Sequence, residues 1–295
     1  MRPTFDVVVA NYNNGKYLES LIDSILCQSC DNWHLIIVDD HSNDNSKQIL
    51  QKYARHPQIS AHFNTSNMGV CATFHRGIVA GSSPFVGLLG ADDALPRHAI
   101  ESMLHCFTEQ PGASMIYSQA TACDEKLTPL HTWPNTQPLN HTEHISNQLH
   151  KIFNFISFTR KAYENSGGLD ISLRKAMDHD LTLKLFEQGD IIHLPQPLYY
   201  YRCHDKGISQ GQSGILAAQY SLLAQIRSCN RPTKFPLSKT ELKKKLHLYH
   251  TRSAHIGISC ENKRLFHHVL NSFLYISSLR DLRTSMATVK KLIAQ

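Results

Sequence analysis

Two apolar runs in this chain each end in a pair of aspartates. The first covers residues 34–38 and ends at Asp39 and Asp40, and the second covers residues 84–91 and ends at Asp92 and Asp93. A continuous apolar run of this length is typical of a parallel strand that is covered on both faces. In an open parallel sheet, ligands bind outside the carboxyl ends of the strands. The sequence therefore predicts an α/β fold that delivers both aspartate pairs to one ligand-binding edge.

Four carboxylates at one edge repel each other unless a cation or hydrogen-bond donors offset their charge. Oxygen ligands suit Mg²⁺ or Mn²⁺, and such an ion can bind phosphate oxygens together with the protein. We therefore expect a metal site that also takes a phosphorylated ligand, and we interpret the chain as an enzyme that handles a nucleoside diphosphate.

The first 90 residues alternate between strand and helix patterns. Strands are expected at residues 6–10, 34–38, 58–63 and 84–89, and helices at 16–26 and 46–54. A turn at residues 67–69 is expected to lead into a third helix that runs to about residue 79. This rhythm predicts a doubly wound, mainly parallel sheet with right-handed crossovers. Further along, the pattern predicts a helix at 96–109, a strand at 113–118, a long loop at 124–150, a helix at 177–188 and a strand at 197–204.

Charge divides the chain into two parts. Residues 1–230 carry 17 Lys and Arg against 21 Asp and Glu, whereas residues 231–295 carry 13 against 3. The pattern also becomes helical from about residue 215. We therefore expect a catalytic domain at residues 1–215 and a helical, basic C-terminal extension at residues 216–295.

Sequence features also bear on the compartment. The eight cysteines are scattered, which fits free thiols in a reducing cytoplasm. No stretch approaches the 18 apolar residues of a membrane span, and a strand expected from residue 6 leaves no room for a signal peptide. We expect a cytoplasmic protein, with peripheral attachment to the inner face of the cell membrane as an open alternative.

Several motifs, taken in order, resemble those of the family 2 glycosyltransferases, which are inverting enzymes with the GT-A fold. The resemblance covers about residues 5–210, and it rests on residues 8–13, 24–28, 37–44, 67–69, 90–93, 167–170 and 178–180. It implies a GT-A sheet that is Rossmann-like, mixed and mainly parallel, with flanking helices. It also implies an enzyme that moves a sugar from a nucleotide-sugar donor to a hydroxyl group.

The resemblance assigns roles on the donor side. A carboxylate at the end of the second strand can accept the imide N–H of uracil or thymine. By resemblance Asp40 is this residue, while Asp39 has the alternative role of capping the following turn. The expected nucleotide and donor contacts are Ala10, Asn11, Tyr12, Asp39, Asp40, Asn67, Arg76 and Asp92.

The resemblance also implies a metal site and a catalytic base. Asp93 and His204 are the expected ligands of Mg²⁺ or Mn²⁺, which bridges the two phosphates of the donor. Asp178 matches the base that deprotonates the acceptor hydroxyl. The chain departs from the family at two positions. Relatives often carry Asp where this chain has Gly90, and they usually carry Glu where it has Met177.

Two functions therefore stay open. The first is a metal-dependent inverting transferase that uses a nucleoside diphosphate sugar, UDP-sugar being favoured, and acts on a glycan or lipid-linked acceptor in surface polysaccharide synthesis. The second is a non-catalytic nucleotide-sugar-binding module, which Gly90 and Met177 favour. A receiver-like phosphoacceptor is a poor fit, because the second aspartate pair has no counterpart there.

The basic extension has its own alternatives. Leucines at 242, 246 and 248 interleave with lysines at 243–245, and apolar residues recur between 265 and 276. Such helices can lie on an anionic membrane surface or can pack as a cap on the catalytic domain. Nucleic acid is not an expected partner, because the basic residues accompany aliphatic and not stacking side chains.

Overall fold

The structure is a computed structural model with two compact units, residues 1–210 and 211–295, each described by itself. It describes residues 5–134, 136–140, 143–152, 155–173, 175–204, 212–228 and 238–260, with residues 231, 271, 275, 281 and 283–287. The sequence placed the boundary between the two parts five residues later, at residue 215.

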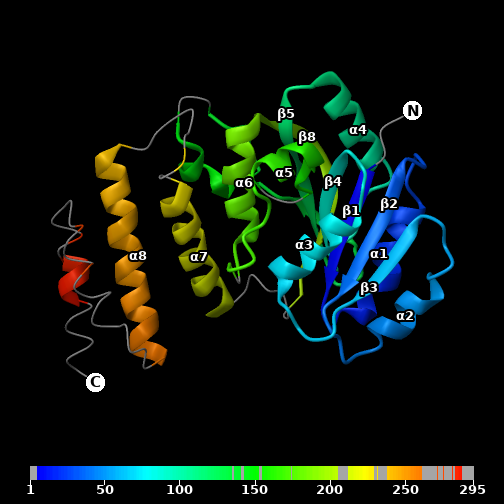
Figure 1. The fold of residues 1–295 in the computed structure, drawn as a ribbon, viewed down its shortest axis with the longest axis horizontal. Coiled ribbons are helices and arrows are strands. Elements are labelled where there is room, and N and C mark those ends of the chain that lie inside the picture. Colours follow the sequence, from blue (N-terminus) through cyan, green and yellow to red (C-terminus); the bar gives the residue numbers. More distant parts are fainter. Residues whose placement is uncertain are drawn as a thin grey trace. The chain divides into compact units, whose positions relative to one another are not determined.

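Four parallel strands form the first half of the sheet of the first unit. They are β1 (Phe5–Asn11), β2 (Trp33–Asp39), β3 (Ile59–Phe63) and β4 (Phe85–Gly90), in the order β3-β2-β1-β4 (Figure 1). The central side chains of β1, β2 and β4 are almost all buried, because helices cover the sheet, whereas those of the edge strand β3 are partly exposed. The parallel strands end at one edge, where Asn11 pairs in register with Asp39 and Ala10 with Gly90.

Helices follow these strands and cover the sheet. They are α1 (Gly15–Leu26), α2 (Ser46–Lys52), α3 (Val70–Ala80) and α4 (Ala99–Glu109). In α1, Leu18, Leu21, Ile22 and Ile25 recur at helical spacing and are fully buried. This single apolar stripe fixes which face of α1 packs on the sheet, and so fixes which residues its first turn presents at the carboxyl edge.

The second half of the sheet is mixed. It consists of β5 (Ala113–Cys123), β6 (Pro129–Thr132), β7 (Ser157–Thr159) and β8 (Asp190–Arg202). Strand β7 lies antiparallel between β4 and β5, and β8 runs parallel to β5. Helices α5 (Arg160–Asn165) and α6 (Met177–Gln188) complete this half. The expected α/β class with a mixed, mainly parallel sheet is confirmed.

The expected long loop at residues 124–150 is wrong in part. The segment contains β6 and two short 3₁₀ turns, η1 (Ile145–Asn147) and η2 (Leu149–Lys151). All four residues of β6 are exposed, so the strand has no buried face and shows no alternation of apolar and polar residues. Strand β8 is also longer than predicted and begins at Asp190.

A buried ion pair holds the amino edge of the sheet. Asp6 on β1 is fully buried, and its carboxylate accepts from Arg160 Nη2 at 2.8 Å and from the Ser83 backbone at 2.9 Å. The same guanidinium donates to the carbonyls of Ile78 and Ser83, each at 2.7 Å. The pair thereby joins the start of α5 to β1 and to the chain that enters β4.

The second unit contains α7 (Gln212–Ser228) and α8 (Lys239–Cys260), which pack against each other. Gln219 Nε2 donates to the Tyr249 carbonyl at 2.9 Å, and Lys245 Nζ donates to Gln225 Oε1 at 2.6 Å. Of the expected apolar stretch at 265–276, only residues 271 and 275 are described. Within the described part of the chain, none of the helices combines the length and apolarity that a membrane span requires.

Candidate active site

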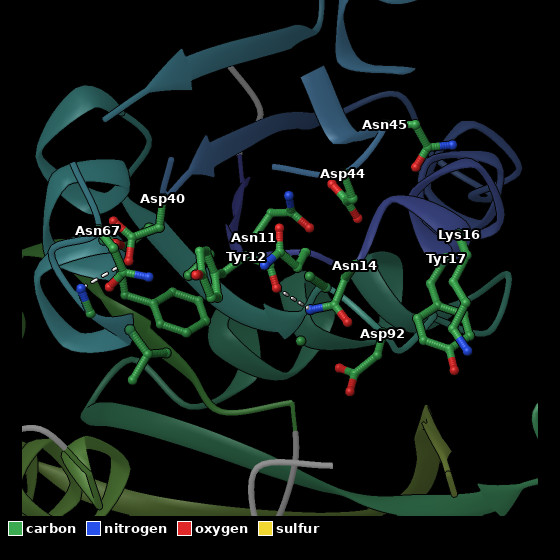
Figure 2. A pocket seen from close by; sticks show the side chains of 18 of the residues that line it. Asn11, Tyr12, Asn14, Lys16, Tyr17, Asp40, Asp44, Asn45, Asn67 and Asp92 are labelled. Atoms are coloured by element: carbon green, nitrogen blue, oxygen red, sulfur yellow. Dashed lines mark hydrogen bonds between the residues drawn. The ribbon is translucent and has the colours of Figure 1, made fainter. Parts of the chain in front are cut away.

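A cavity of about 790 Å³ lies at the carboxyl edge of the sheet. Its size suits a nucleotide-sized ligand, since ligand pockets commonly measure about 300–1,000 Å³. Residues from the ends of β1 and β4, the first turns of α1 and α3, and the loop after β2 line it (Figure 2). The expected site residues among them are Ala10, Asn11, Tyr12, Asp40, Asn67, Asp92 and His204.

Hydrogen bonds join the turn after β1 to the loop after β2. Asn11 Nδ2 donates to Asp39 Oδ2 at 2.7 Å, and the Ser42 backbone N–H donates to Asp39 Oδ1 at 3.0 Å. The Gly15 N–H at the start of α1 donates to Asp44 Oδ2 at 2.8 Å. Burial acts against ionisation of Asp44, but the hydrogen bonds from Ser46 and Gly15 outweigh it and lower the pKa of this carboxyl. The motif after β2 thus holds the two loops together.

Asp39 takes part in this support and does not line the cavity. Its carboxylate is 3% exposed and is bonded to Asn11 and Ser42. These bonds are in line with the turn-capping alternative for Asp39, and the donor contact expected of it stays a prediction. The different roles of the two neighbours follow from their hydrogen bonds, because Asp39 is the last residue of β2 and Asp40 lies in the loop that follows.

Asp40 faces the cavity and organises the loop before α3. Its Oδ1 accepts from Asn64 Nδ2 at 2.7 Å and from the Met68 N–H at 2.8 Å, and its Oδ2 accepts from the Gly69 N–H at 2.8 Å. Gly69 has a φ of 86°, a conformation that a side chain disfavours, so glycine is required for this approach. Asp40 therefore places Asn67 and Gly69 on the cavity wall.

Arg76 lies outside the cavity lining. Its Nη1 donates to the Phe63 carbonyl at 2.8 Å and to the side-chain oxygen of Asn64. Asn64 in turn donates to Asp40, so Arg76 acts on Asp40 indirectly, by holding the Asn64 side chain in place. The predicted contact of Arg76 with a donor phosphate has no counterpart in this geometry.

In the second aspartate pair, too, one residue lines the cavity and the other is buried in the protein. Asp92 lines the cavity and accepts from His204 Nε2 at 2.9 Å. Asp93 is 5% exposed and turns inward, where it accepts from the Tyr199 hydroxyl at 2.5 Å and from the Arg202 backbone N–H at 2.8 Å. The structure therefore brings Asp92, and not the predicted Asp93, to His204.

Residues of β8 impose this choice. Tyr199 accepts from the Gly90 N–H at 3.0 Å while its hydroxyl holds Asp93, and Arg202 Nε donates to the Asp92 carbonyl at 2.5 Å. Burial first, and then the charge of Asp92, raise the pKa of the Asp93 carboxyl to about 8. In the absence of metal, this carboxyl therefore retains its proton at neutral pH.

Gly90 is explained by the same packing. A Cβ atom at this position would lie 2.6 Å from Asp93 Oδ2, 3.0 Å from Asp92 Oδ1 and 3.1 Å from the Tyr199 hydroxyl. An aspartate at position 90 would also add a third carboxylate to this space. The departure from the family pattern is therefore a consequence of how β8 closes on the turn.

Asp92 and His204 would hold one side of a divalent metal site once His204 Nε2 loses the proton that it donates to Asp92. A carboxylate oxygen and an imidazole nitrogen both bind Mn²⁺, and carboxylate oxygen suits Mg²⁺. Among the described residues, no three His, Cys, Asp or Glu side chains form a closed metal site. Such a half-open site suits an ion that takes its remaining ligands from a diphosphate and water.

Asp178 lies in the first turn of α6, is exposed and does not line the cavity. The residue before this helix, Ala176, has a φ of 55°, in the left-handed region that costs energy for a side-chain residue. Asp180 is buried and forms an ion pair with Lys184 at 2.7 Å. Asp180 is thus structural, while the role of Asp178 stays a prediction.

Sequence reasoning missed Lys16 and Tyr17, which line the cavity from the first turn of α1, and Tyr199 and Arg202, which shape it from β8. The signal for Lys16 and Tyr17 was their position directly after the turn that follows β1. Tyr199 and Arg202 gave no comparable signal, because their contacts span more than 100 residues.

The geometry can be compared with known proteins. The model of the family "Glycosyl transferase family 2" matches residues 6–167, which span β1 to β7, the two aspartate pairs and most of the cavity wall. This match covers more than half of the chain.

The chain belongs to glycosyltransferase family 2.

Curated relatives of this glycosyltransferase include polysaccharide synthases. A chondroitin synthase of Escherichia coli is 24% identical over 253 residues, covering 78% of this chain and 36% of that protein. A hyaluronan synthase of Pasteurella multocida is 23% identical over 233 residues, covering 78% of this chain and 23% of that protein. The chain thus spans about a third or less of the length of these relatives.

Solved structures of glycosyltransferases share the fold. TarS of S. aureus (residues 1–349) in complex with UDP-GlcNAc has a TM-score of 0.62 at 15% identity, covering 97% of this chain and 79% of that one. The mannosyltransferase PcManGT of Pyrobaculum calidifontis, in complex with GDP-Man and Mn²⁺, also has a TM-score of 0.62, at 16% identity, covering 100% and 76%. The predicted GT-A fold is confirmed.

Proposed function

We propose that this glycosyltransferase moves a sugar from a nucleoside diphosphate sugar, with UDP as the favoured nucleotide, to a hydroxyl group of a glycan or lipid-linked acceptor. The observation that carries the proposal is the cavity that joins Asp40 at one end to the Asp92–His204 pair. The named ligands of the solved neighbours, UDP-GlcNAc and GDP-Man, support this donor class.

The two ends of the cavity suggest how the donor lies. Asp40 and Asn67 lie at one end and Asp92 lies toward the other, with Asn11 and Tyr12 between them (Figure 2). An acceptor oxygen at Asp40 suits a base with a ring N–H, as in uracil. The diphosphate then extends toward Asp92 and His204.

The proposed reaction is a single displacement with inversion. The acceptor oxygen attacks the anomeric carbon, Asp178 takes the hydroxyl proton, and the bond from the anomeric carbon to the diphosphate oxygen breaks. Asp92 and His204 would hold a Mg²⁺ or Mn²⁺ ion, which supplies charge neutralisation to the departing diphosphate. Asp178 lies outside the cavity lining, so this role requires the bound acceptor to extend to the start of α6.

A donor screen tests the proposal. The full chain is incubated with UDP-, GDP- and CDP-sugars, with Mg²⁺, Mn²⁺ or EDTA, and release of the nucleoside diphosphate is measured. We expect slow, metal-dependent hydrolysis of one donor class and faster release with a glycan acceptor. No binding and no hydrolysis of any donor would refute the proposal.

The exposed position of Asp178 also favours a second candidate, a module that binds nucleotide sugars without turnover. Titration calorimetry beside the hydrolysis assay separates the two candidates. Binding of a nucleotide sugar without hydrolysis or transfer, for all acceptors offered, would support the second.

The pathway and location are further parts of the proposal. The names of the relatives, which include an O-antigen biosynthesis protein of Myxococcus xanthus, support surface polysaccharide synthesis. We propose that the enzyme works in the cytoplasm and that the basic second unit attaches it to the inner face of the membrane. Lys243 and Lys244 on α8 are exposed and are available for such a contact.

A further inference from the structure

A cationic side chain reaches the cavity beyond Asp92. Lys16 is the only lysine or arginine among the described residues that line the cavity. Figure 2 shows Asp40 and Lys16 at opposite ends, with Asp92 between them. A nucleotide whose base lies at Asp40 and whose phosphates pass Asp92 therefore directs its terminal phosphate toward Lys16.

A carboxylate from another part of the sheet holds the Lys16 ammonium. Lys16 Nζ donates to Glu125 Oε1 at 2.7 Å, and the Tyr17 hydroxyl donates to the same oxygen at 3.1 Å. Glu125 lies in the turn between β5 and β6. The side chains of Lys16 and Glu125 are 55% and 60% exposed, so water competes for both charges and the pair is weak.

The ion pair is connected to the Asp92–His204 pair. The Tyr17 ring lies 5.1 Å from the His204 ring, and the Arg202 guanidinium lies 4.4 Å from the Tyr17 ring centre. Arg202 also donates to the Glu125 carbonyl oxygen, which fixes the turn that carries Glu125. These contacts hold the backbone around the pair in place. The exposed Lys16 ammonium group can bind either Glu125 or a ligand in the cavity that Lys16 lines.

We propose that Lys16 binds the terminal phosphate of the nucleoside diphosphate, and that Glu125 competes with this phosphate for the ammonium group. Without nucleotide, Glu125 neutralises Lys16. With nucleotide, the ammonium group moves to the phosphate, which carries more negative charge than a carboxylate. Lys16 then also stabilises the charge that develops on the diphosphate as it leaves. The inference rests on the proposed function.

The test is a double-variant cycle on the affinity for UDP, measured by titration calorimetry on the full chain with Mn²⁺. Lys16→Met keeps the alkyl stem and removes the charge, and we expect the Kd for UDP to rise about 10-fold or more. Lys16→Arg should restore most of this loss. Glu125→Gln keeps an acceptor for Tyr17 but removes the competing charge, and should lower the Kd about two- to fivefold.

The double variant and a matched control make the test specific. In Lys16→Met/Glu125→Gln, the second change should have no further effect, because the ammonium group is gone. UMP lacks the terminal phosphate and should bind equally to the wild-type chain and to Lys16→Met. Lys52 forms a similar exposed pair with Glu19 at 2.7 Å away from the cavity, so Lys52→Met should leave the Kd unchanged.

Failure of the inference can be told apart from failure of the proposed function. If no nucleoside diphosphate binds the wild-type chain, the proposed function fails. If UDP binds and neither Lys16→Met nor Glu125→Gln changes its Kd, the inference is overturned and the function stands. Equal losses for UMP and UDP in Lys16→Met would also overturn it. A loss confined to UDP-glucuronate, with UDP and UDP-glucose unchanged, would overturn it by assigning Lys16 to a sugar carboxylate.

Discussion

At the amino edge of the sheet Asp6 is buried beside a cation, whereas at the carboxyl edge Asp40 and Asp93 are buried beside uncharged donors. Asp6 accepts from the Arg160 guanidinium at 2.8 Å. Asp40 accepts from one side-chain amide and two backbone N–H groups, and Asp93 accepts from a hydroxyl and a backbone N–H. The amino edge thus neutralises its charge within the protein.

This difference separates structural carboxylates from ligand-binding ones. A buried charge that serves the fold needs a permanent partner, since its desolvation is otherwise uncompensated. At the binding edge, Asp40 keeps unneutralised charge for a ligand to offset, whereas Asp93 stays neutral because burial raises its pKa and it retains its proton. The first turn of α6 repeats the contrast within three residues, because Asp180 is paired with Lys184 and Asp178 is exposed.

The largest expected effect concerns this turn of α6. Asp178→Asn keeps the shape of the side chain but removes its basicity, so sugar transfer should fall about 10²–10⁴-fold while donor affinity changes little. Steady-state transfer rates and donor titration measure both quantities. Asp180→Asn is the control, and it should lower stability and leave turnover of the folded protein intact. Near-normal transfer by Asp178→Asn would place the base elsewhere.

At the amino edge, Arg160→Met should lower the free energy of unfolding by about 3–5 kcal/mol, because it leaves the Asp6 carboxylate buried without its cation. Urea denaturation measures this loss. Lys52→Met removes a cation from an exposed pair and should leave the denaturation midpoint unchanged. If the two variants are equally stable, the comparison between the edges does not hold.

At the carboxyl edge, Asp92→Asn should weaken the metal-dependent part of UDP binding by about 10–100-fold, whereas Asp93→Asn should leave most of it intact. The measured quantity is the ratio of the Kd values for UDP with EDTA and with Mn²⁺. The reverse result would restore the assignment of the metal to Asp93 that the sequence suggested.

Asp93 also predicts a dependence of stability on pH in the absence of metal. The carboxyl ionises near pH 3.9 in the unfolded chain, but its pKa in the folded protein is about 8. Between these values the folded state holds a proton that the unfolded state has released. The free energy of unfolding should therefore fall as pH rises, by up to about 1.4 kcal/mol per pH unit, and level off above the folded pKa.

Urea denaturation with EDTA at several pH values measures this slope. Asp93→Asn cannot ionise and should flatten it. A slope that persists in the variant would assign the titration to another group.

The smallest expected effect lies in the second unit. Lys243→Glu/Lys244→Glu should weaken binding of the full chain to vesicles that contain anionic lipid, by about 1 kcal/mol per lysine removed. Flotation with anionic and neutral vesicles measures the binding. Lys47→Glu/Lys126→Glu makes the same charge change at exposed positions of the first unit and is the control. If the wild-type chain ignores anionic vesicles at moderate salt, the membrane proposal is wrong.

Much of the fold could be read from local pattern. The apolar runs of β1, β2 and β4 and the spacing of Leu18, Leu21, Ile22 and Ile25 report burial directly, because each element needs a continuous face against the core. The predicted bounds of α6 agree with the structure for the same reason. Strand β6 could not be found this way, since its four residues are exposed and its pairing with β5 leaves no apolar signature.

By itself, the sequence determined that two aspartate pairs reach one edge of a mainly parallel sheet, because strand direction and burial follow from the apolar runs. Only the tertiary structure decided which member of each pair faces the ligand. That choice depends on Asn11 and Ser42 for Asp39, and on Tyr199 and Arg202 for Asp93, the latter more than 100 residues away. Consecutive side chains carry the same chemistry in sequence, but hydrogen bonds from distant strands turn one inward and leave the other in the cavity.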